Sequence, residues 1–129
     1  MNLVIIGRFP ADTEARIRAF FPPVWRVVFA GPDLAGPGLR DAEALIPEHL
    51  PINAALLDRA PKMRMIQTGA GYDNVDLAEC TRRGILVCSA AGVNAAAVAE
   101  HTMALILGWY KSIVYLDTFL KAHRHSREL

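Results

Sequence analysis

Five short runs of mostly apolar residues recur along the chain and alternate with segments of helical pattern. The runs are Leu3–Ile6, Trp25–Ala30, Ala42–Ile46, Met63–Thr68 and Ile85–Ser89. Short runs that are apolar on both faces are typical of strands buried inside a parallel sheet. The alternation therefore predicts an α/β fold with a five-stranded, mostly parallel sheet and helices on both faces, in three layers. Five strands fit the flavodoxin-like order as well as the Rossmann order.

Local signals place helices between these runs. Asp12 can cap a helix that ends before Pro22, and residues 52–60 have a helical pattern that ends at Pro61. The segment from Asp76 to Glu79 is a capping-box pattern, and Gly84 closes the short helix that it opens.

The last predicted helix begins after Asn94 and runs from about Ala95 to about Ala122. Its apolar residues cover more than one face, so we expect burial on several sides, against a second domain or a second copy in a homo-oligomer. Residues 1–122 are predicted to form one domain that includes this helix. Residues 123–129 are predicted to form a polar tail or the start of an interdomain linker.

Composition excludes several classes of protein. Lys and Arg number 14 and Asp and Glu 13, a net charge of +1, so there is no electrostatic case for nucleic acid or an anionic membrane as partner. The longest apolar stretch, Met103–Tyr110, is far short of the ~20 residues that span a bilayer. The N-terminus lacks the features of a signal peptide. Cys80 and Cys88 have no metal-binding spacing, so we expect no metal site and a reducing, cytoplasmic setting.

The segment Gly69–Asp76 follows the fourth predicted strand and carries the strongest local signal for a ligand. Small residues after a strand let backbone N–H groups approach a ligand closely, and successive free amides bind anions. The alternative is a tight strand-to-helix turn. It is not a dinucleotide-binding fingerprint, because Asn74 stands where the third glycine is required.

Two further positions are candidates for ligand contact. Asn94 opens the last helix and either caps it or offers its side-chain amide to a ligand at the helix N-terminus. His49 lies in a loop bounded by prolines and either contacts substrate or belongs to a surface loop. In a parallel sheet, the loops at 7–10, 47–51, 69–74 and 91–94 share the carboxyl edge, where ligands bind.

Two blocks of sequence resemble the D-isomer-specific 2-hydroxyacid dehydrogenases. They are Met65–Asp76, continued by Arg83-Gly84-Ile85, and Gly92–Thr102. The resemblance implies a flavodoxin-like substrate domain whose long helix leads to a Rossmann domain that binds NAD or NADP.

The same resemblance assigns roles to individual positions. The backbone amides of Ala70 and Gly71 would hold the carboxylate of a small 2-hydroxy or 2-oxo acid. Asn94 would lie near substrate and nicotinamide, Val98 would pack on the nicotinamide side, and His49 would belong to the substrate mouth.

The family's catalytic Arg, Glu and His and its cofactor loop belong to the second domain, which these 129 residues do not contain. We therefore expect no catalytic residue in this chain, no NAD(P) bound to it alone, and a substrate domain separated from the rest of a dehydrogenase and inactive by itself. The second hypothesis is a stand-alone binding or dimerisation module derived from that fold.

Overall fold

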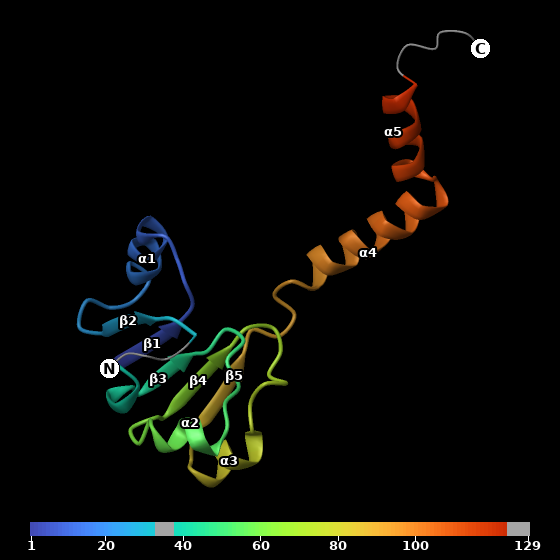
Figure 1. Cartoon of the computed structure of the whole chain (residues 1–129). Coiled ribbons are helices and arrows are strands. Elements are labelled where there is room, and N and C mark those ends of the chain that lie inside the picture. Colours follow the sequence, from blue (N-terminus) through green and yellow to red (C-terminus); the bar gives the residue numbers. More distant parts are fainter. Residues whose placement is uncertain (33–37, 124–129) are drawn as a thin grey trace. The chain divides into compact units, whose positions relative to one another are not determined.

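A five-stranded parallel sheet forms the centre of the chain, in a computed structural model that describes residues 1–32 and 38–123 (Figure 1). The strand order is β2-β1-β3-β4-β5, which is the flavodoxin-like order. The strands are β1 (Asn2–Ile6), β2 (Arg26–Ala30), β3 (Ala44–Ile46), β4 (Met65–Thr68) and β5 (Leu86–Ser89). All five predicted strands are confirmed, with ends within two residues of the prediction.

Short helices connect the strands, and two longer ones follow β5. The helices are α1 (Ala11–Arg18), the 3-10 helix η1 (Leu39–Asp41), α2 (Ala54–Asp58), α3 (Leu77–Arg82), α4 (Ala95–Tyr110) and α5 (Ile113–Ala122). By its internal contacts the chain divides into two units, Met1–Ala91 and Gly92–Leu129, and each is described by itself. The segment at 33–41 is rich in Gly and Pro, a composition that predicts a loop. It lies in part outside the described residues, and its last residues form η1.

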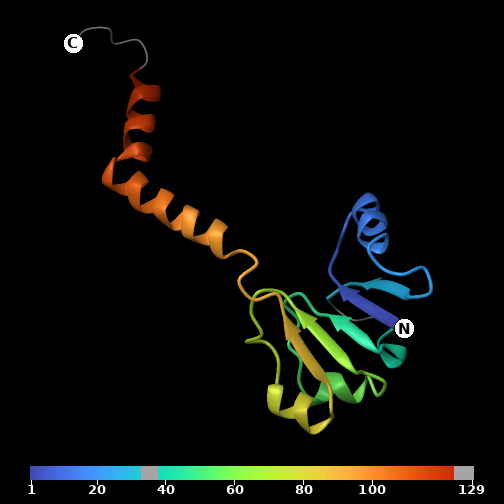
Figure 2. The same cartoon turned by 180° about the vertical axis from the view of Figure 1, so that it is seen from behind.

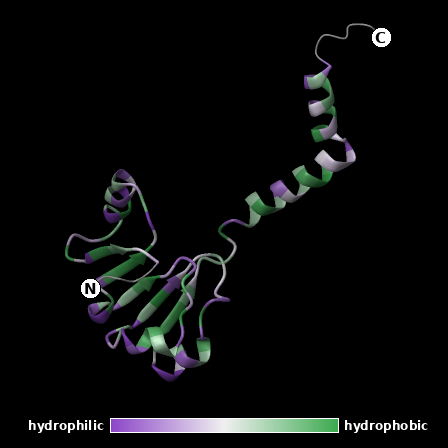
Figure 3. Cartoon of the chain, viewed as in Figure 1, coloured by the Kyte–Doolittle hydropathy of each residue, from purple (hydrophilic) through white to green (hydrophobic). Residues whose placement is uncertain are grey.

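The strands of the sheet are mostly hydrophobic (Figure 3), and each face of the sheet has its own core. On one face, Leu3, Ile5 and Val27 pack with side chains of α1 and its flanking loops. On the other face, Leu45 and Ile66 are fully buried under α2 and α3. The predicted three-layer arrangement is thus confirmed (Figure 2).

The layer on the α1 side is incomplete. Leu86 of β5 pairs with Met65 of β4, yet its side chain is 67% exposed whereas that of Met65 is partly buried. The apolar contacts of α1 and its neighbouring loops extend over β2, β1 and β3 to Met65. The β5 end of this face is therefore open in the first unit.

Local capping signals explain two of the helices around the sheet. The Asp76 side chain accepts a hydrogen bond from the Glu79 N–H (2.9 Å), and Gly84 ends the region of α3 with a φ of +70°. The helix start at Asp76 and its end at Gly84 are therefore confirmed, but only the Asp76 half of the predicted capping box forms. Asn53 caps α2 by accepting from the Leu56 N–H (3.1 Å). The prediction that Asp12 caps α1 is wrong, because α1 begins at Ala11 after Pro10 and Asp12 lies within its first turn.

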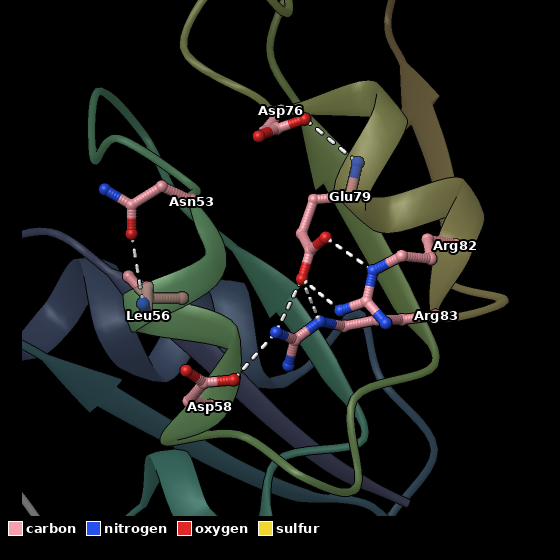
Figure 4. A network of polar contacts seen from close by, with 7 residues as sticks. All are labelled: Asn53, Leu56, Asp58, Asp76, Glu79, Arg82 and Arg83. Carbon is pink, nitrogen blue, oxygen red and sulfur yellow. Dashed lines mark hydrogen bonds and ion pairs between the residues drawn. The ribbon is translucent and has the colours of Figure 1, made fainter.

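An ionic network joins α3 to α2 (Figure 4). The Glu79 carboxylate accepts hydrogen bonds from Arg82 and Arg83, at distances of 2.6 to 2.8 Å. Arg83 also donates to Asp58 at the end of α2 (2.7 Å). Glu79 therefore does not form the second half of a capping box. Its carboxylate instead links two arginines, one of which reaches the neighbouring helix.

The second unit consists of α4 and α5, and here the expectation of one uninterrupted helix is corrected. Lys111 and Ser112 separate the two helices, Ser112 has a left-handed backbone (φ +51°), and the pair is bent by 56°. A left-handed residue cannot continue the i to i+4 hydrogen bonding of a right-handed helix, which is why the helix stops there. Residues 124–129 of the predicted tail lie outside the described part of the chain.

Apolar side chains of the second unit are exposed throughout. No residue of α4 or α5 is buried, and Trp109 is 85% exposed. Among the described residues, no single helix is long and apolar enough to cross a membrane. The bent pair of α4 and α5 reaches the required length and composition only when the two are counted together.

The ionic network predicts a pH-dependent contribution to stability. Hydrogen bonds from Arg82, and next from Arg83, lower the pKa of Glu79 to about 2. A carboxyl whose pKa is lowered by folding stabilises the folded state above its unfolded pKa of 4.5, and the contribution is lost as the pH falls towards about 2. Glu79→Gln should therefore reduce the free energy of unfolding at pH 7, and the deficit should shrink between pH 4.5 and 2.

Urea unfolding followed by circular dichroism at several pH values measures this difference. Glu14→Gln is the matched control, because Glu14 takes part in no ion pair among the described residues. A deficit for Glu79→Gln that stays constant with pH would contradict the assignment.

Candidate functional site

Loops from neighbouring strands meet at the carboxyl edge of the sheet and enclose a hollow of about 320 Å³. It lies where the loop after β3 meets the loop after β4. The hollow is lined by Glu48, His49, Gly69, Ala70, Gly71, Asp73 and Asn74. The structure thus brings three of the predicted site residues together: His49, Ala70 and Gly71.

The loop after β4 contributes two residues with unbonded backbone N–H groups to the lining of this hollow. Ala70 and Gly71 are both exposed, and within residues 1–32 and 38–123 their N–H groups donate no hydrogen bond. The Gly69 carbonyl accepts from the Ala90 N–H (2.8 Å), which fixes the start of the loop to the end of β5. Two adjacent, unused amides at the mouth of a hollow are suited to binding an anion such as a carboxylate.

Main-chain bonds hold the two loops side by side. The Ile52 N–H donates to the Asn74 carbonyl (2.8 Å), and the Asp76 N–H donates to the Ile52 carbonyl (2.9 Å). The Asn74 side chain adds a third bond by donating from Nδ2 to the Leu50 carbonyl (2.7 Å). Sequence reasoning treated Asn74 only as a missing glycine or as a capping residue of the turn, because nothing local shows a partner 24 residues away.

Glu48 and Asp73 bring two carboxylates to the hollow, and sequence reasoning singled out neither. Glu48 has a left-handed backbone (φ +44°), and a β-carbon at Gly7 would lie 3.1 Å from its Oε2. Oδ2 of Asp73 would lie 3.3 Å from a β-carbon at Gly71. Gly7 itself has a φ of +151°, and a β-carbon there would lie 2.6 Å from the Phe9 ring, so glycine is required at this position.

Asn94 and Val98 belong to the second unit, where each is described with its own neighbours. Asn94 occupies the N-cap position of α4, as predicted, and its carbonyl accepts from the Val98 N–H (2.9 Å). Its side chain forms no capping hydrogen bond within the described residues, so the side-chain amide remains available to a ligand. Val98 is 54% exposed.

The hollow, as the described residues line it, has the features of neither a metal site nor a dinucleotide site. No group of three or more His, Cys, Asp or Glu side chains there is arranged to hold a metal ion. The hollow is small for a dinucleotide, and Glu48 and Asp73 would repel a pyrophosphate. Burial raises the pKa of the Cys80 thiol, which is consistent with a structural role.

Comparison with known proteins relates the chain to one family. The family model described as "D-isomer specific 2-hydroxyacid dehydrogenase, catalytic domain" matches residues 32–124. A glyoxylate reductase of Thermococcus litoralis is 40% identical over 72 residues, which are 55% of this chain and 22% of that protein. A D-3-phosphoglycerate dehydrogenase of Mycobacterium leprae is 40% identical over 73 residues, or 56% of this chain and 14% of that protein.

The fold is similar to that of a solved D-lactate dehydrogenase from Aquifex aeolicus, in a complex with NAD and lactic acid. The TM-score is 0.81 at 24% identity, over 99% of this chain and 39% of that one. The chain thus spans about a fifth or less of the two curated relatives and about two fifths of this structure.

The bond from Asn74 to Leu50 predicts a measurable stability effect. Asn74→Ala removes it and leaves a partly buried carbonyl without that donor, so the free energy of unfolding should fall by about 1 kcal/mol. Urea unfolding checks the value. Asn94→Ala is the matched control and should change it by less than about 0.5 kcal/mol, because the Asn94 side chain forms no cap. Equal losses in the two variants would contradict the assignment.

Proposed function

Because the chain belongs to the D-isomer specific 2-hydroxyacid dehydrogenases and carries their catalytic-domain sequence, we propose that it binds the substrate of an NAD(P)-dependent enzyme of this family. The substrate is a small 2-hydroxy or 2-oxo acid, and the reaction is hydride transfer between this acid and the nicotinamide. The observation that supports the proposal is the pair of unbonded amides at Ala70 and Gly71, two residues that line the hollow at the carboxyl edge.

In this proposal the substrate carboxylate accepts hydrogen bonds from the Ala70 and Gly71 N–H groups. The bonds of Asn74 and Ile52 keep the β3 and β4 loops in register, so the amides need little reorganisation when the acid binds. His49 lines the same hollow and contacts the part of the acid that extends beyond its carboxylate. These residues orient the acid, and the described residues of the first unit provide no step beyond binding.

Asn94 and Val98 are proposed to act where the nicotinamide of the cofactor meets the substrate. The Asn94 side-chain amide, free of a capping bond, hydrogen-bonds substrate or nicotinamide, and the exposed Val98 side chain packs on the nicotinamide side. The cofactor supplies or accepts the hydride. The resemblance to the family implies that the cofactor phosphates and the catalytic Arg, Glu and His belong to a Rossmann domain, which these 129 residues do not contain.

Binding of a 2-hydroxy acid to the chain tests the proposal directly. Titration with D-glycerate should shift the amide NMR signals of Ala70 and Gly71 more than those of the sheet. Ala70→Pro removes one donor and should weaken binding by about fivefold, the equivalent of about 1 kcal/mol. Gly69→Ala is the control, because it keeps every N–H and its added β-carbon meets nothing within 4 Å. Shifts confined to other regions would rule out the amide cradle.

Activity of the isolated chain is a second test. We expect no oxidation of NADH or NADPH with glyoxylate, pyruvate or hydroxypyruvate, because proton transfer and cofactor binding require residues that this chain lacks. A spectrophotometric assay at 340 nm measures this. Turnover that copurifies with the 129-residue chain and survives repurification would contradict the proposal that catalysis requires residues outside this chain.

The exposed helices support a further part of the proposal, association with a second copy of the chain. No residue of α4 or α5 is buried, and Tyr110 and Val114 are 80% and 78% exposed. Apolar surface of this extent is typical of an interface. The same association is expected under the alternative function, a stand-alone dimerisation module without catalysis.

Light scattering over a range of concentrations measures this association. Leu116→Glu should shift the chain towards the monomer, because it places a charge in the apolar surface of α5. Thr118→Glu adds the same charge at a polar position and should have a smaller effect. A wild-type chain that stays monomeric at high concentration would contradict the interface.

A further inference from the structure

The charges that line the hollow restrict the kind of acid that it can accept. We propose that Glu48 and Asp73 select 2-hydroxy and 2-oxo acids with a single negative charge and disfavour acids with a second anionic group, such as a phosphate or a second carboxylate. The proposal rests on the function proposed above, since it concerns the same hollow, and it narrows the substrate class.

The first observation is an imbalance of charge. Of the seven residues lining the hollow, two are carboxylates and none is Lys or Arg. Among the described residues, neither Glu48 nor Asp73 takes part in an ion pair, so both charges remain uncompensated there. His49 is the one lining side chain that can carry a positive charge.

The second observation is where the carboxylates lie. Asp73 extends alongside Gly71, with Oδ2 at 3.3 Å from the place of a β-carbon on that residue. Glu48 extends towards Gly7, in the loop after β1. The Asp73 carboxylate is thus beside the Ala70 and Gly71 amides, and the Glu48 carboxylate is on the side of β1. A ligand held by the Ala70 and Gly71 N–H groups therefore has the Asp73 carboxylate near its anchored end and the Glu48 carboxylate towards β1.

The size of the hollow keeps any bound group close to both charges. A volume of about 320 Å³ corresponds to a width of about 7 Å if the hollow is equally wide in all directions. The first negative charge of a substrate is matched by the Ala70 and Gly71 N–H groups. A second negative charge has no lysine or arginine partner in the lining, and it lies within about 7 Å of like charges.

Coulomb's law gives the expected size of the selection. Two like charges about 7 Å apart in water-like surroundings change a binding constant by about threefold, and by more where the protein excludes water. Two such carboxylates together disfavour the second charge by about tenfold. Added salt should reduce the discrimination, because the hollow is open to solvent.

The test compares two acids that differ only by a phosphate, D-glycerate and 3-phospho-D-glycerate. Each is titrated into the complete 129-residue chain at pH 8 and low ionic strength, and the amide signals of Ala70 and Gly71 report binding. We expect D-glycerate to bind about tenfold more tightly. Glu48→Gln and Asp73→Asn should each reduce this ratio by about threefold.

Asp41→Asn is the matched control for both variants. It changes the net charge by the same amount, but Asp41 precedes β3, at the opposite edge of the sheet, where it pairs with Lys62 (2.6 Å). The ratio should stay at its wild-type value in this variant.

The outcomes separate the two proposals. If both acids shift Ala70 and Gly71 with equal affinity, or if Glu48→Gln and Asp73→Asn leave the ratio unchanged, charge selection is wrong and the substrate-binding role stands. If neither acid shifts these amides, the substrate-binding role fails, and charge selection fails with it.

Discussion

Parallel pairing of the five strands is the constraint on which the other features of the first unit depend. Because the strands all run in one direction, the loops that follow β1, β3 and β4 leave the sheet at the same edge. Burial of both faces fixes the strand register, since a shift of one residue would turn apolar side chains such as Leu45 and Ile66 to the wrong face. The hollow is therefore positioned by the core beneath it.

The chemistry at this edge comes mainly from the backbone. Amides such as those of Ala70 and Gly71 carry no net charge, so they can bind a carboxylate while acidic side chains stand nearby. A lysine or arginine in the same place would attract every anion. In the proposed site, affinity comes from neutral donors and selectivity from Glu48 and Asp73, so the two properties can be altered separately.

Sequence predicted the features whose cause is local. Runs such as Leu3–Ile6 showed the strands, and the Asp76 cap and the turn at Gly84 were readable from neighbouring residues. The break at Ser112 was missed, because neither glycine nor proline marks it. Glu48 and Asn74 were missed because their roles depend on partners in other loops, and only the folded chain brings these together. The resemblance to a family located Ala70 and Gly71, and spacing alone left that segment open.

The pairing of Ile52 with the segment from Asn74 to Asp76 has a consequence for how such a domain can diversify. It forms a fixed boundary after the loop at 47–51, which is itself bounded by Pro47 and Pro51. The exposed residues 48 and 49 can change in charge or size on one side of this boundary, while the turn at Ala70 and Gly71 on the other side keeps its geometry. If the proposed role is right, substitutions at these two adjacent positions alter which acid is accepted without disturbing the amides proposed to hold its carboxylate.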